Sequence, residues 1–294
     1  MAFRLHKLAW GAARTFHPLQ WARVACGRRL DWIRHDNFLV LSAVRSGTCL
    51  LQDYLNCSGR IRCYGEIIGA DQPIYGNAYG MSPERLRLHV ESFFVKRPGR
   101  MVGAKIMTFH LDELTLKLPE LYEMLARPKI VVLYRGNILE QFASFKLAMH
   151  YGVWHVNKPK HLGTITLDPD EFLAFAERER RMWRENLAAL GDVGADVHVL
   201  SYERLAGWPE PALREVFEFL GVPAVPAHSR LVRTNPQPPW RKISNYDEFV
   251  ARGIPETAVL ELPTAAQIAA PKAAWVDRPS SVAARHFDAC REAA

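Results

Sequence analysis

The sequence predicts an α/β protein in which a central, mainly parallel sheet is flanked by helices. Short apolar runs without alternation, such as residues 38–41 and 129–134, are typical of strands covered on both faces. Between them lie segments with apolar residues at helical spacing, and this alternation of strand and helix favours parallel pairing. With 294 residues, of which 49% are hydrophobic, the chain is long enough to bury one substantial core.

The first strand leads through a turn of mostly small residues into a helix. Residues 38–41 form the strand, and Leu50, Leu51 and Tyr54 fall on one face of the helix. The turn, residues 42–48, holds a single arginine, Arg45, and its backbone N–H groups can close around an anion at the start of the helix. We therefore expect this turn to be a phosphate-binding loop.

Later elements follow the same alternation. Strands are expected at residues 101–106, 129–134 and 196–201, and helices at residues 138–149, 168–190 and 209–220. Ser82 followed by Pro83 is typical of a helix N-terminus. Residues 69–83 and the proline-rich residues 234–245 are expected to be surface loops. The side chains expected to face inward from the first two of these long helices are Ile138, Phe142, Phe145, Met149, Phe172, Ala176, Trp183, Leu187 and Leu190.

Three parts of the chain are expected. Residues 1–36 form a basic amphipathic extension, residues 37–262 one main domain, and residues 263–294 a weakly ordered tail rich in alanine and proline. The extension interleaves tryptophan with arginine, so it either contacts an anionic membrane surface peripherally or packs onto the domain with its basic side in solvent. No apolar run reaches the roughly 18 to 20 residues needed to cross a bilayer, so no membrane anchor is expected.

Charge and cysteine content narrow the class of protein. The net charge of +7 favours anionic partners, and by itself leaves a nucleotide, an anionic lipid surface and nucleic acid open. The five cysteines show neither C-x-x-C spacing nor a partnered histidine pair, which argues against a disulfide framework and a zinc site. A reducing, cytoplasmic location is therefore expected.

The loop around Arg45 is not a regular ATP-binding P-loop, because the G-x-x-x-x-G-K-[ST] pattern fails at its first glycine and at its lysine. Residues 45–51, Arg-Ser-Gly-Thr-Cys-Leu-Leu, instead resemble the 5'-phosphosulfate loop of sulfotransferases that use 3'-phosphoadenosine 5'-phosphosulfate (PAPS). The resemblance assigns donor binding to Arg45, Ser46, Gly47, Thr48 and Cys49. At Cys49 the chain departs from the threonine or serine that this family prefers.

Residues 131–144 resemble the second signature of the same family, in which an arginine after a strand and a serine on the next helix hold the 3'-phosphate. The resemblance gives these roles to Arg135 and Ser144. A guanidinium can donate two hydrogen bonds to one phosphate, and the hydroxyl adds a neutral donor. A second anion site implies a donor with two separated anionic ends.

Residues 200–205 resemble the Tyr-Glu element that follows the next strand in this family. This implies that Tyr202 contacts adenine and that Glu203 is structural. Arg241 and Lys242 lie in a segment that resembles the C-terminal cofactor loop, which implies contact with a phosphate of the donor.

The resemblance covers residues 38–245 and leans toward bacterial carbohydrate sulfotransferases, such as those that modify Nod factors or lipopolysaccharide. Three local matches support this: Gly65-Glu66, the Gly-Ala-Lys of residues 103–105, and the Arg-Gly-Asn of residues 135–137 with Glu140 downstream. The resemblance implies a P-loop-like sulfotransferase fold and PAPS as donor. It further implies a glycan or glycolipid hydroxyl as acceptor, with neither a metal nor nucleic acid involved.

Sulfuryl transfer needs a base for the acceptor proton and stabilisation of the charge on the departing phosphate. Glu66 is the first candidate base, since it resembles the glutamate that serves as base in bacterial glycan enzymes of this family. His110 is the second candidate, because it follows Lys105 at approximately the spacing found in animal relatives. Arg45 and Lys105 are expected to stabilise the bridging oxygen and the sulfuryl group.

Other interpretations stay open. A small-molecule kinase with a degenerate P-loop is one, and a non-catalytic, membrane-peripheral nucleotide-binding protein is another. At the level of single residues, Glu66 could cap a helix, and His110 could be a buried histidine satisfied by its neighbours. Trp154 and Trp183 could shape an acceptor site, although packing in a core or lid explains them as well.

Overall fold

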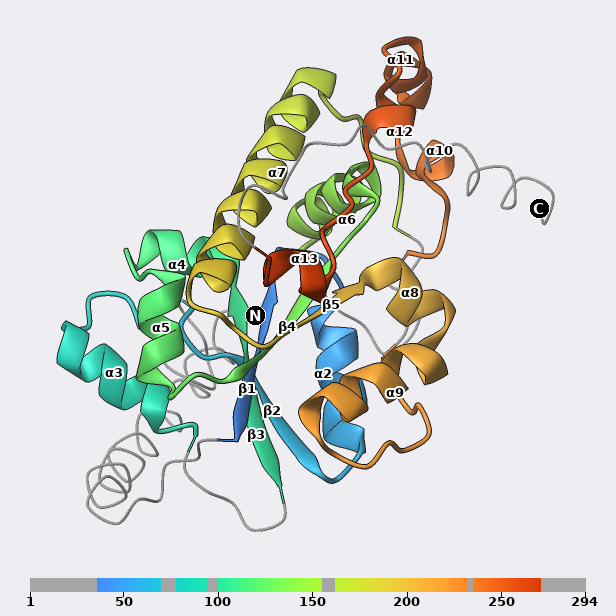
Figure 1. The fold of residues 1–294 in the computed structure, drawn as a ribbon. Helices are drawn as coiled ribbons and strands as arrows, with labels where there is room; N and C mark the ends of the chain where they lie inside the picture. Colours follow the sequence, from blue (N-terminus) through green and yellow to red (C-terminus); the bar gives the residue numbers. More distant parts are fainter. Residues whose placement is uncertain (1–35, 70–77, 95–99, 155–161, 232–234, 271–294) are drawn as a thin grey trace, which may run out of the picture.

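In the computed structural model of this chain, five parallel strands form one sheet in the order β2-β3-β1-β4-β5 (Figure 1). The structure describes residues 36–69, 78–94, 100–154, 162–231 and 235–270. The sheet confirms the predicted architecture. The strands are β1 (Asn37–Ser42), β2 (Ile61–Glu66), β3 (Met101–Met107), β4 (Lys129–Tyr134) and β5 (Val197–Ser201).

Helices cover both faces of the sheet. On one face, α2, α8 and α9 pack with Phe38 and Val40 of β1, whereas Leu39 and Leu41 of the same strand join the core beneath the remaining helices. All six residues of β1 are buried, which explains why its sequence shows no polar alternation. The helices are α2 (Thr48–Cys57), α3 (Pro83–Glu91), α4 (Thr108–Glu113), α5 (Leu118–Met124), α6 (Ile138–Tyr151), α7 (Pro169–Asp192), α8 (Tyr202–Gly207), α9 (Pro209–Leu220), α10 (Pro239–Lys242), α11 (Tyr246–Ala251), α12 (Ile254–Thr257) and α13 (Ala265–Ile268).

The strand order has a topological switch point between β1 and β4. These two strands are neighbours, yet β1 leads into α2 on one face of the sheet and β4 leads into α6 on the other. The turns that follow the two strands therefore diverge. In open parallel sheets, ligands bind outside the carboxyl ends of the strands at such a switch point.

The long helices lie close to the predicted positions, with one difference in the inward set. Ser82 caps α3 as expected, accepting a hydrogen bond from the Arg85 backbone N–H at 3.4 Å. Met149, predicted to face inward, is 60% exposed. Over its first turns α6 is buried on all sides, and near its end only Leu147 and Ala148 are buried. A single apolar stripe therefore does not describe this helix.

In two further segments the secondary structure differs from what the sequence led us to expect. No strand was predicted at β2, because Arg62 and Gly65 interrupt its apolar pattern. The prediction of a surface loop at residues 234–245 was wrong in part. Pro238 and Pro239 begin helix α10, and Lys242 and Ile243 are buried, at 3% and 1% exposure. Ile243 also forms a parallel bridge with Ile165, which fastens this segment to the domain.

Several predictions concern residues outside the described ranges. These residues are the N-terminal extension up to residue 35, residues 70–77 of the predicted loop, residues 155–161, and the tail beyond residue 270. Helix α13, beyond the boundary predicted at residue 262, packs against α7 with Ile268 only 1% exposed. Within the described part of the chain, none of the helices is long and apolar enough to span a bilayer.

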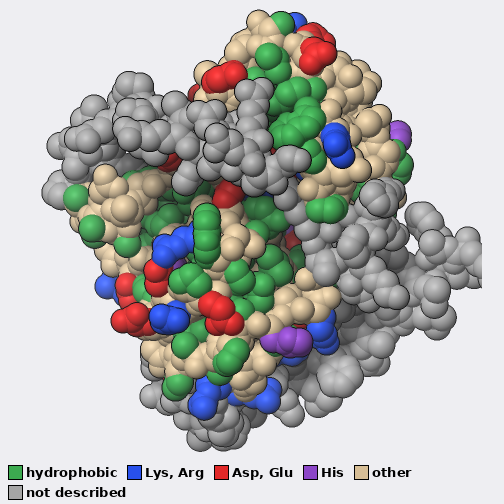
Figure 2. All heavy atoms as spheres, turned by 90° about the vertical axis from the view of Figure 1, so that its right-hand side faces the viewer, with side chains coloured by type: hydrophobic (Ala, Val, Ile, Leu, Met, Phe, Trp, Pro, Cys, Tyr) green, Lys and Arg blue, Asp and Glu red, His purple; other side chains and the backbone are tan. Residues whose placement is uncertain are grey.

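The outer surface on the side of α8 and α9 does not concentrate the net positive charge. On this face Figure 2 shows lysine and arginine side chains interspersed with aspartate and glutamate. A uniformly basic face, as a nucleic-acid backbone would require, is not formed by the described residues seen in this view.

Gly103 offers a test of the packing around β1. A Cβ at this position would lie 2.3 Å from Cε1 and Cζ of Phe38, whose ring is completely buried. We expect Gly103→Ala to lower the free energy of unfolding by roughly 1–3 kcal/mol, measured by urea denaturation. Gly207→Ala is the control, because no atom lies within 4 Å of its new Cβ. Equal stability of the two variants would contradict the packing described for β1 and β3.

Candidate active site

The loop between β1 and α2 has the geometry of an anion cradle. Arg45 and Gly47 both adopt left-handed backbone conformations, with φ of 56° and 85°. Left-handed residues next to right-handed ones turn successive N–H groups toward one concave side, which is how backbone binds phosphate. No side chain caps the first turn of helix α2. The backbone N–H groups of this turn therefore remain available to an anion bound at the loop.

Three successive carbonyl groups of this loop each accept a hydrogen bond from a side chain. Ser46 Oγ donates to the Ala43 oxygen at 2.7 Å, Gln141 Nε2 to the Val44 oxygen at 2.9 Å, and Arg135 Nη1 to the Arg45 oxygen at 3.3 Å. A left-handed conformation costs a residue such as Arg45 about 1–2 kcal/mol, so it persists only when its surroundings hold it. These three donors provide that support and keep the carbonyl groups occupied.

Tyr202, at the start of α8, packs against the same loop. A Cβ added to Gly47 would lie 2.4 Å from Cδ2 of the Tyr202 ring, so glycine is needed there for space as well as for its positive φ. The guanidinium of Arg135 lies over the Tyr202 ring, 4.6 Å from its centroid. In this structure the ring therefore supports both the loop and Arg135.

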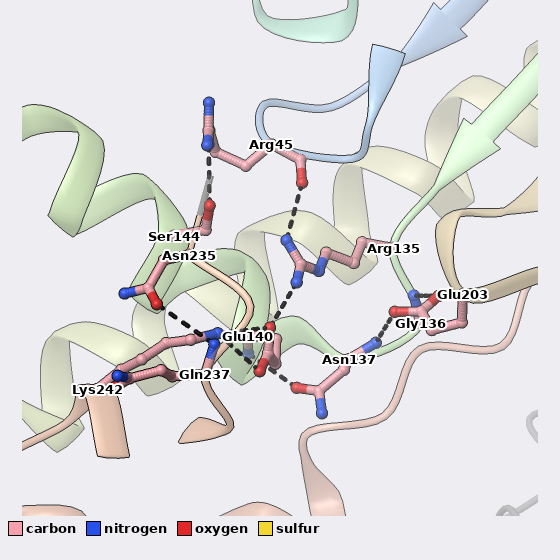
Figure 3. A network of polar contacts seen from close by, with 10 residues as sticks. All are labelled: Arg45, Arg135, Gly136, Asn137, Glu140, Ser144, Glu203, Asn235, Gln237 and Lys242. Carbon is pink, nitrogen blue, oxygen red and sulfur yellow. Dashed lines mark hydrogen bonds and ion pairs between the residues drawn. The ribbon is translucent and has the colours of Figure 1, made fainter. Parts of the chain in front are cut away.

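A buried carboxylate joins the turn after β4 to the C-terminal segment (Figure 3). Glu140 Oε2 accepts from Arg135 Nη2 at 2.6 Å, and Glu140 Oε1 accepts from Lys242 Nζ at 3.0 Å. Arg135, Glu140 and Lys242 are 6%, 6% and 3% exposed. One carboxylate thus serves two buried cations, and the three together keep a surplus of one positive charge.

Arg45 adds a further cation to this cluster and links it to the loop. Its Nε donates to Ser144 Oγ at 3.0 Å, and its Nη1 donates to the backbone oxygen of Trp154. Burial, and then the charge of Arg135, lower the pKa of the Arg45 guanidinium. A partly buried pair of arginines is stabilised by a bound anion, since an uncompensated charge away from water is costly.

Unused donors lie in the same region. Arg135 Nε and Asn235 Nδ2 are buried atoms without a hydrogen-bond partner among the described residues. The Asn235 Oδ1 accepts from the Gln237 backbone N–H at 3.3 Å (Figure 3). Buried donors are rarely left unpaired in the absence of a ligand or water. Asn235 was not predicted, because no local pattern marks it.

Glu203 fixes the turn that carries Arg135. Its two carboxylate oxygens accept from the backbone N–H groups of Gly136 and Asn137, at 2.9 and 3.1 Å. Asn137 in turn caps α6 by accepting from the Glu140 N–H at 2.8 Å. Glu203 therefore makes the structural contacts that the sequence led us to expect for it.

A second group of charges lies on the other side of the loop, at Lys105. This lysine is 3% exposed, and its Nζ lies 3.4 Å from Glu66 Oε1 and 3.4 Å from Cys49 Sγ. Glu66 faces Lys105 because the pairing of β2 with β3 shifts by one residue between Tyr64 and Glu66. Without this bulge Gly65 would stand opposite Lys105, so the bulge aims the carboxylate.

Local environment separates the charge states of Lys105 and His110. Burial disfavours the charged ammonium of Lys105. The electrostatic interactions with Cys49 and Glu66 favour it more strongly, so the pKa of Lys105 is raised. Burial lowers the pKa of His110, with Glu66 opposing this effect and Lys105 adding to it. His110 is therefore neutral around pH 7, and its Nδ1 is buried without a partner among the described residues.

Most of the predicted site residues come together in two clusters joined by the loop at residues 42–49. Arg45, Arg135, Ser144, Tyr202 and Lys242 form the first. Arg241, on the exposed side of α10, is not drawn into it by any contact among the described residues. The second cluster contains Glu66, Lys105 and Cys49, with His110 within electrostatic reach. Ser46 and Thr48 are buried in the loop between the clusters, at 0% and 7% exposure.

Comparisons with known proteins bear on overall shape only. No protein-family model and no curated protein matches the chain. Among solved structures, a sulfotransferase from Alicyclobacillus acidocaldarius is 18% identical, with a TM-score of 0.46 over 74% of this chain and 90% of that one. The sulfotransferase domain from the curacin biosynthetic pathway is 16% identical, with a TM-score of 0.44 over 79% of this chain and 95% of that one.

A mouse sulfotransferase, SULT7A1, complexed with PAP, is 16% identical, with a TM-score of 0.40 over 76% of this chain and 66% of that one. At such identities and scores the function of this chain has to be derived from its own site residues.

Glu140 is the residue whose loss should disturb the first cluster most. Glu140→Gln leaves Arg135 and Lys242 without their shared charge, and we expect the free energy of unfolding to fall by about 3–5 kcal/mol. Urea denaturation measures the change, with Glu218→Gln on the exposed side of α9 as control. Added sulfate should stabilise the Glu140 variant more than the parent. An unchanged stability would show that the buried ion pairs contribute nothing.

Proposed function

We propose that this chain is a sulfotransferase that moves the sulfuryl group of PAPS to a hydroxyl of a glycan or glycolipid. The observation that supports it is the pair of anion sites at the switch point of the sheet. One is the N–H cradle after β1, the other the cluster of Arg135, Ser144 and Lys242, and the Arg45 side chain connects them. A donor with phosphates at both ends of a nucleoside fits this arrangement.

The loop itself favours a sulfuryl donor over a nucleoside triphosphate. A kinase P-loop directs a lysine from the loop onto the β- and γ-phosphates. Here Arg45 occupies the loop, and its guanidinium contacts Ser144 and Trp154. The buried ammonium groups at the site come instead from outside the loop, at Lys105 on β3 and at Lys242 on α10, and each faces a carboxylate. This arrangement supports proton transfer and charge stabilisation on one side of the loop.

The residues divide the chemical steps between the two sides of the loop. The N–H groups of the cradle would hold the 5'-phosphate and take up the charge that develops on its oxygen as the sulfuryl group departs. Lys105 would stabilise charge on the group in transfer. Glu66, with 27% of its side chain exposed, is accessible to an acceptor and would accept the hydroxyl proton. His110, neutral around pH 7, is the second group able to do so.

The acceptor class and the compartment belong to the same proposal. The glycan or glycolipid acceptor rests on the motif resemblance of Gly65-Glu66 and of residues 135–140. A cytoplasmic location rests on the cysteine pattern, and Cys49, Cys57 and Cys63 are free thiols in the described part of the chain. Peripheral contact with an anionic membrane would be made by the basic N-terminal extension. A non-catalytic nucleotide-binding protein is the alternative.

Binding of adenosine 3',5'-bisphosphate (PAP), the desulfated donor, tests the two-site arrangement. PAP at 100 times its Kd should stabilise the parent protein by about 2.7 kcal/mol, measured as a shift in Tm. Arg135→Ala and Arg45→Ala should each lose most of this stabilisation, since each removes a buried or partly buried cation from the proposed anion sites. Stabilisation by ATP with Mg²⁺ but not by PAP would favour the kinase interpretation instead.

Replacement of Glu66 tests the mechanism separately from binding. We expect Glu66→Gln to lower kcat for PAPS-dependent sulfation by about 10²- to 10⁴-fold, since the amide cannot take a proton. PAP affinity should stay near that of the parent, because Glu66 lies outside the first cluster. Glu185→Gln, on the exposed side of α7, is the matched control. Full turnover of the Glu66 variant would assign the base elsewhere, and His110→Ala would then be compared.

A further inference from the structure

A buried glutamine connects the donor loop to a buried carboxyl group behind it. Gln141 on α6 is 1% exposed, and its Nε2 donates to the Val44 oxygen at 2.9 Å and to Glu179 Oε2 at 3.0 Å. Glu179 lies on α7, which runs beside α6, and is 5% exposed. Both contacts require the amide nitrogen to face them, because a backbone carbonyl oxygen can only accept. The orientation of the Gln141 amide is therefore determined by its partners.

The contact to Val44 controls an N–H group that the donor would use. In a trans peptide the carbonyl oxygen of Val44 and the N–H of Arg45 point in opposite directions within one rigid plane. Holding the Val44 oxygen toward α6 therefore holds the Arg45 N–H on the opposite side of the peptide plane, away from α6. Of the other side chains that donate hydrogen bonds to carbonyl groups of this loop, Arg135 is itself a proposed phosphate ligand, and Ser46 belongs to the loop. Gln141 supports it from outside.

Packing alone does not account for this polar pair. Glu179 and Gln141 lie next to a core cluster that contains Phe142, Phe172 and Phe175. Burial raises the pKa of Glu179 to about 7, although the hydrogen bond from Gln141 and the charge of Arg178 both oppose this rise. A buried polar pair can usually be replaced by apolar residues of similar volume without loss of stability. What distinguishes this pair is its hydrogen bonding, which connects Glu179 through Gln141 to the Val44 oxygen.

We propose that Gln141, held in place by Glu179, is a positioning residue that directs the Arg45 N–H toward the 5'-phosphate of the donor. The proposal rests on the proposed function, since it concerns the donor site of that reaction. It assigns part of the donor affinity to two residues that do not touch the donor. Glu179 acts here as a hydrogen-bond acceptor, so its charge is not required.

The test separates positioning from stability with a double variant. In Gln141→Leu/Glu179→Leu both side chains become apolar, and the Val44 oxygen loses the donor that Gln141 supplied, so the free energy of unfolding should fall by no more than about 1–3 kcal/mol in urea denaturation. The Kd for PAP, measured by isothermal titration, should nevertheless rise roughly tenfold, as expected for one misdirected hydrogen bond to the anion. The conservative variant Glu179→Gln keeps an acceptor oxygen for Gln141 Nε2, and its Kd should stay close to the parent value.

Each outcome decides a point. A stable double variant that binds PAP as tightly as the parent overturns the positioning role and leaves the proposed function intact. Absence of PAP binding by the parent overturns the proposed function, and the positioning role with it. If the double variant does not fold, Gln141→Met is titrated in its place, and an unchanged Kd again overturns the role. Weak binding by Glu179→Gln would contradict the claim that the charge is not required.

Discussion

The carboxylate of Glu140 is the interaction on which the site depends. It is bonded to Arg135, in the turn after β4, and to Lys242, more than one hundred residues further along the chain. Without a shared carboxylate, two buried cations would repel one another and the C-terminal segment would lose its main polar contact with α6. The first cluster is therefore held together by an acid that forms no part of the proposed chemistry.

The loop after β1 depends on this assembly in turn. Arg135 can support the Arg45 carbonyl and lie over the Tyr202 ring because Glu140 holds its other side. Tyr202 then fills the space that glycine leaves at position 47. Elements that follow β1, β4 and β5 thus meet at one edge of the sheet, each limiting the freedom of the next. Such mutual support preorganises an anion site before any ligand arrives.

The sequence allowed candidate site residues to be predicted where they stand directly after a strand. Arg45 and Arg135 could be found because each stands just after an unbroken apolar run, and parallel strands bring such ends to one edge. Glu179 could not, since it lies within a run of charged residues, Glu177 to Arg181, that resembles a solvated helix face. Gln141 and Asn235 carry no local pattern, and their partners are set by packing between distant segments. The prolines before Lys242 predicted a surface loop, whereas they start a helix whose last residue is buried.

The bulge in β2 has a consequence for how the two halves of the reaction could diversify. Glu66 stands on β2, an edge strand of the sheet, and β3 separates it from β1, which leads into the loop at residues 42–49. Under the proposed function, changes in the segments beyond this edge would alter the acceptor side while leaving β1, β4 and their turns untouched. The part of the sheet at β1 and β4 would then bind the donor, and the part at β2 and β3 would meet the acceptor. New acceptors could be acquired at the margin of the sheet without rebuilding its centre.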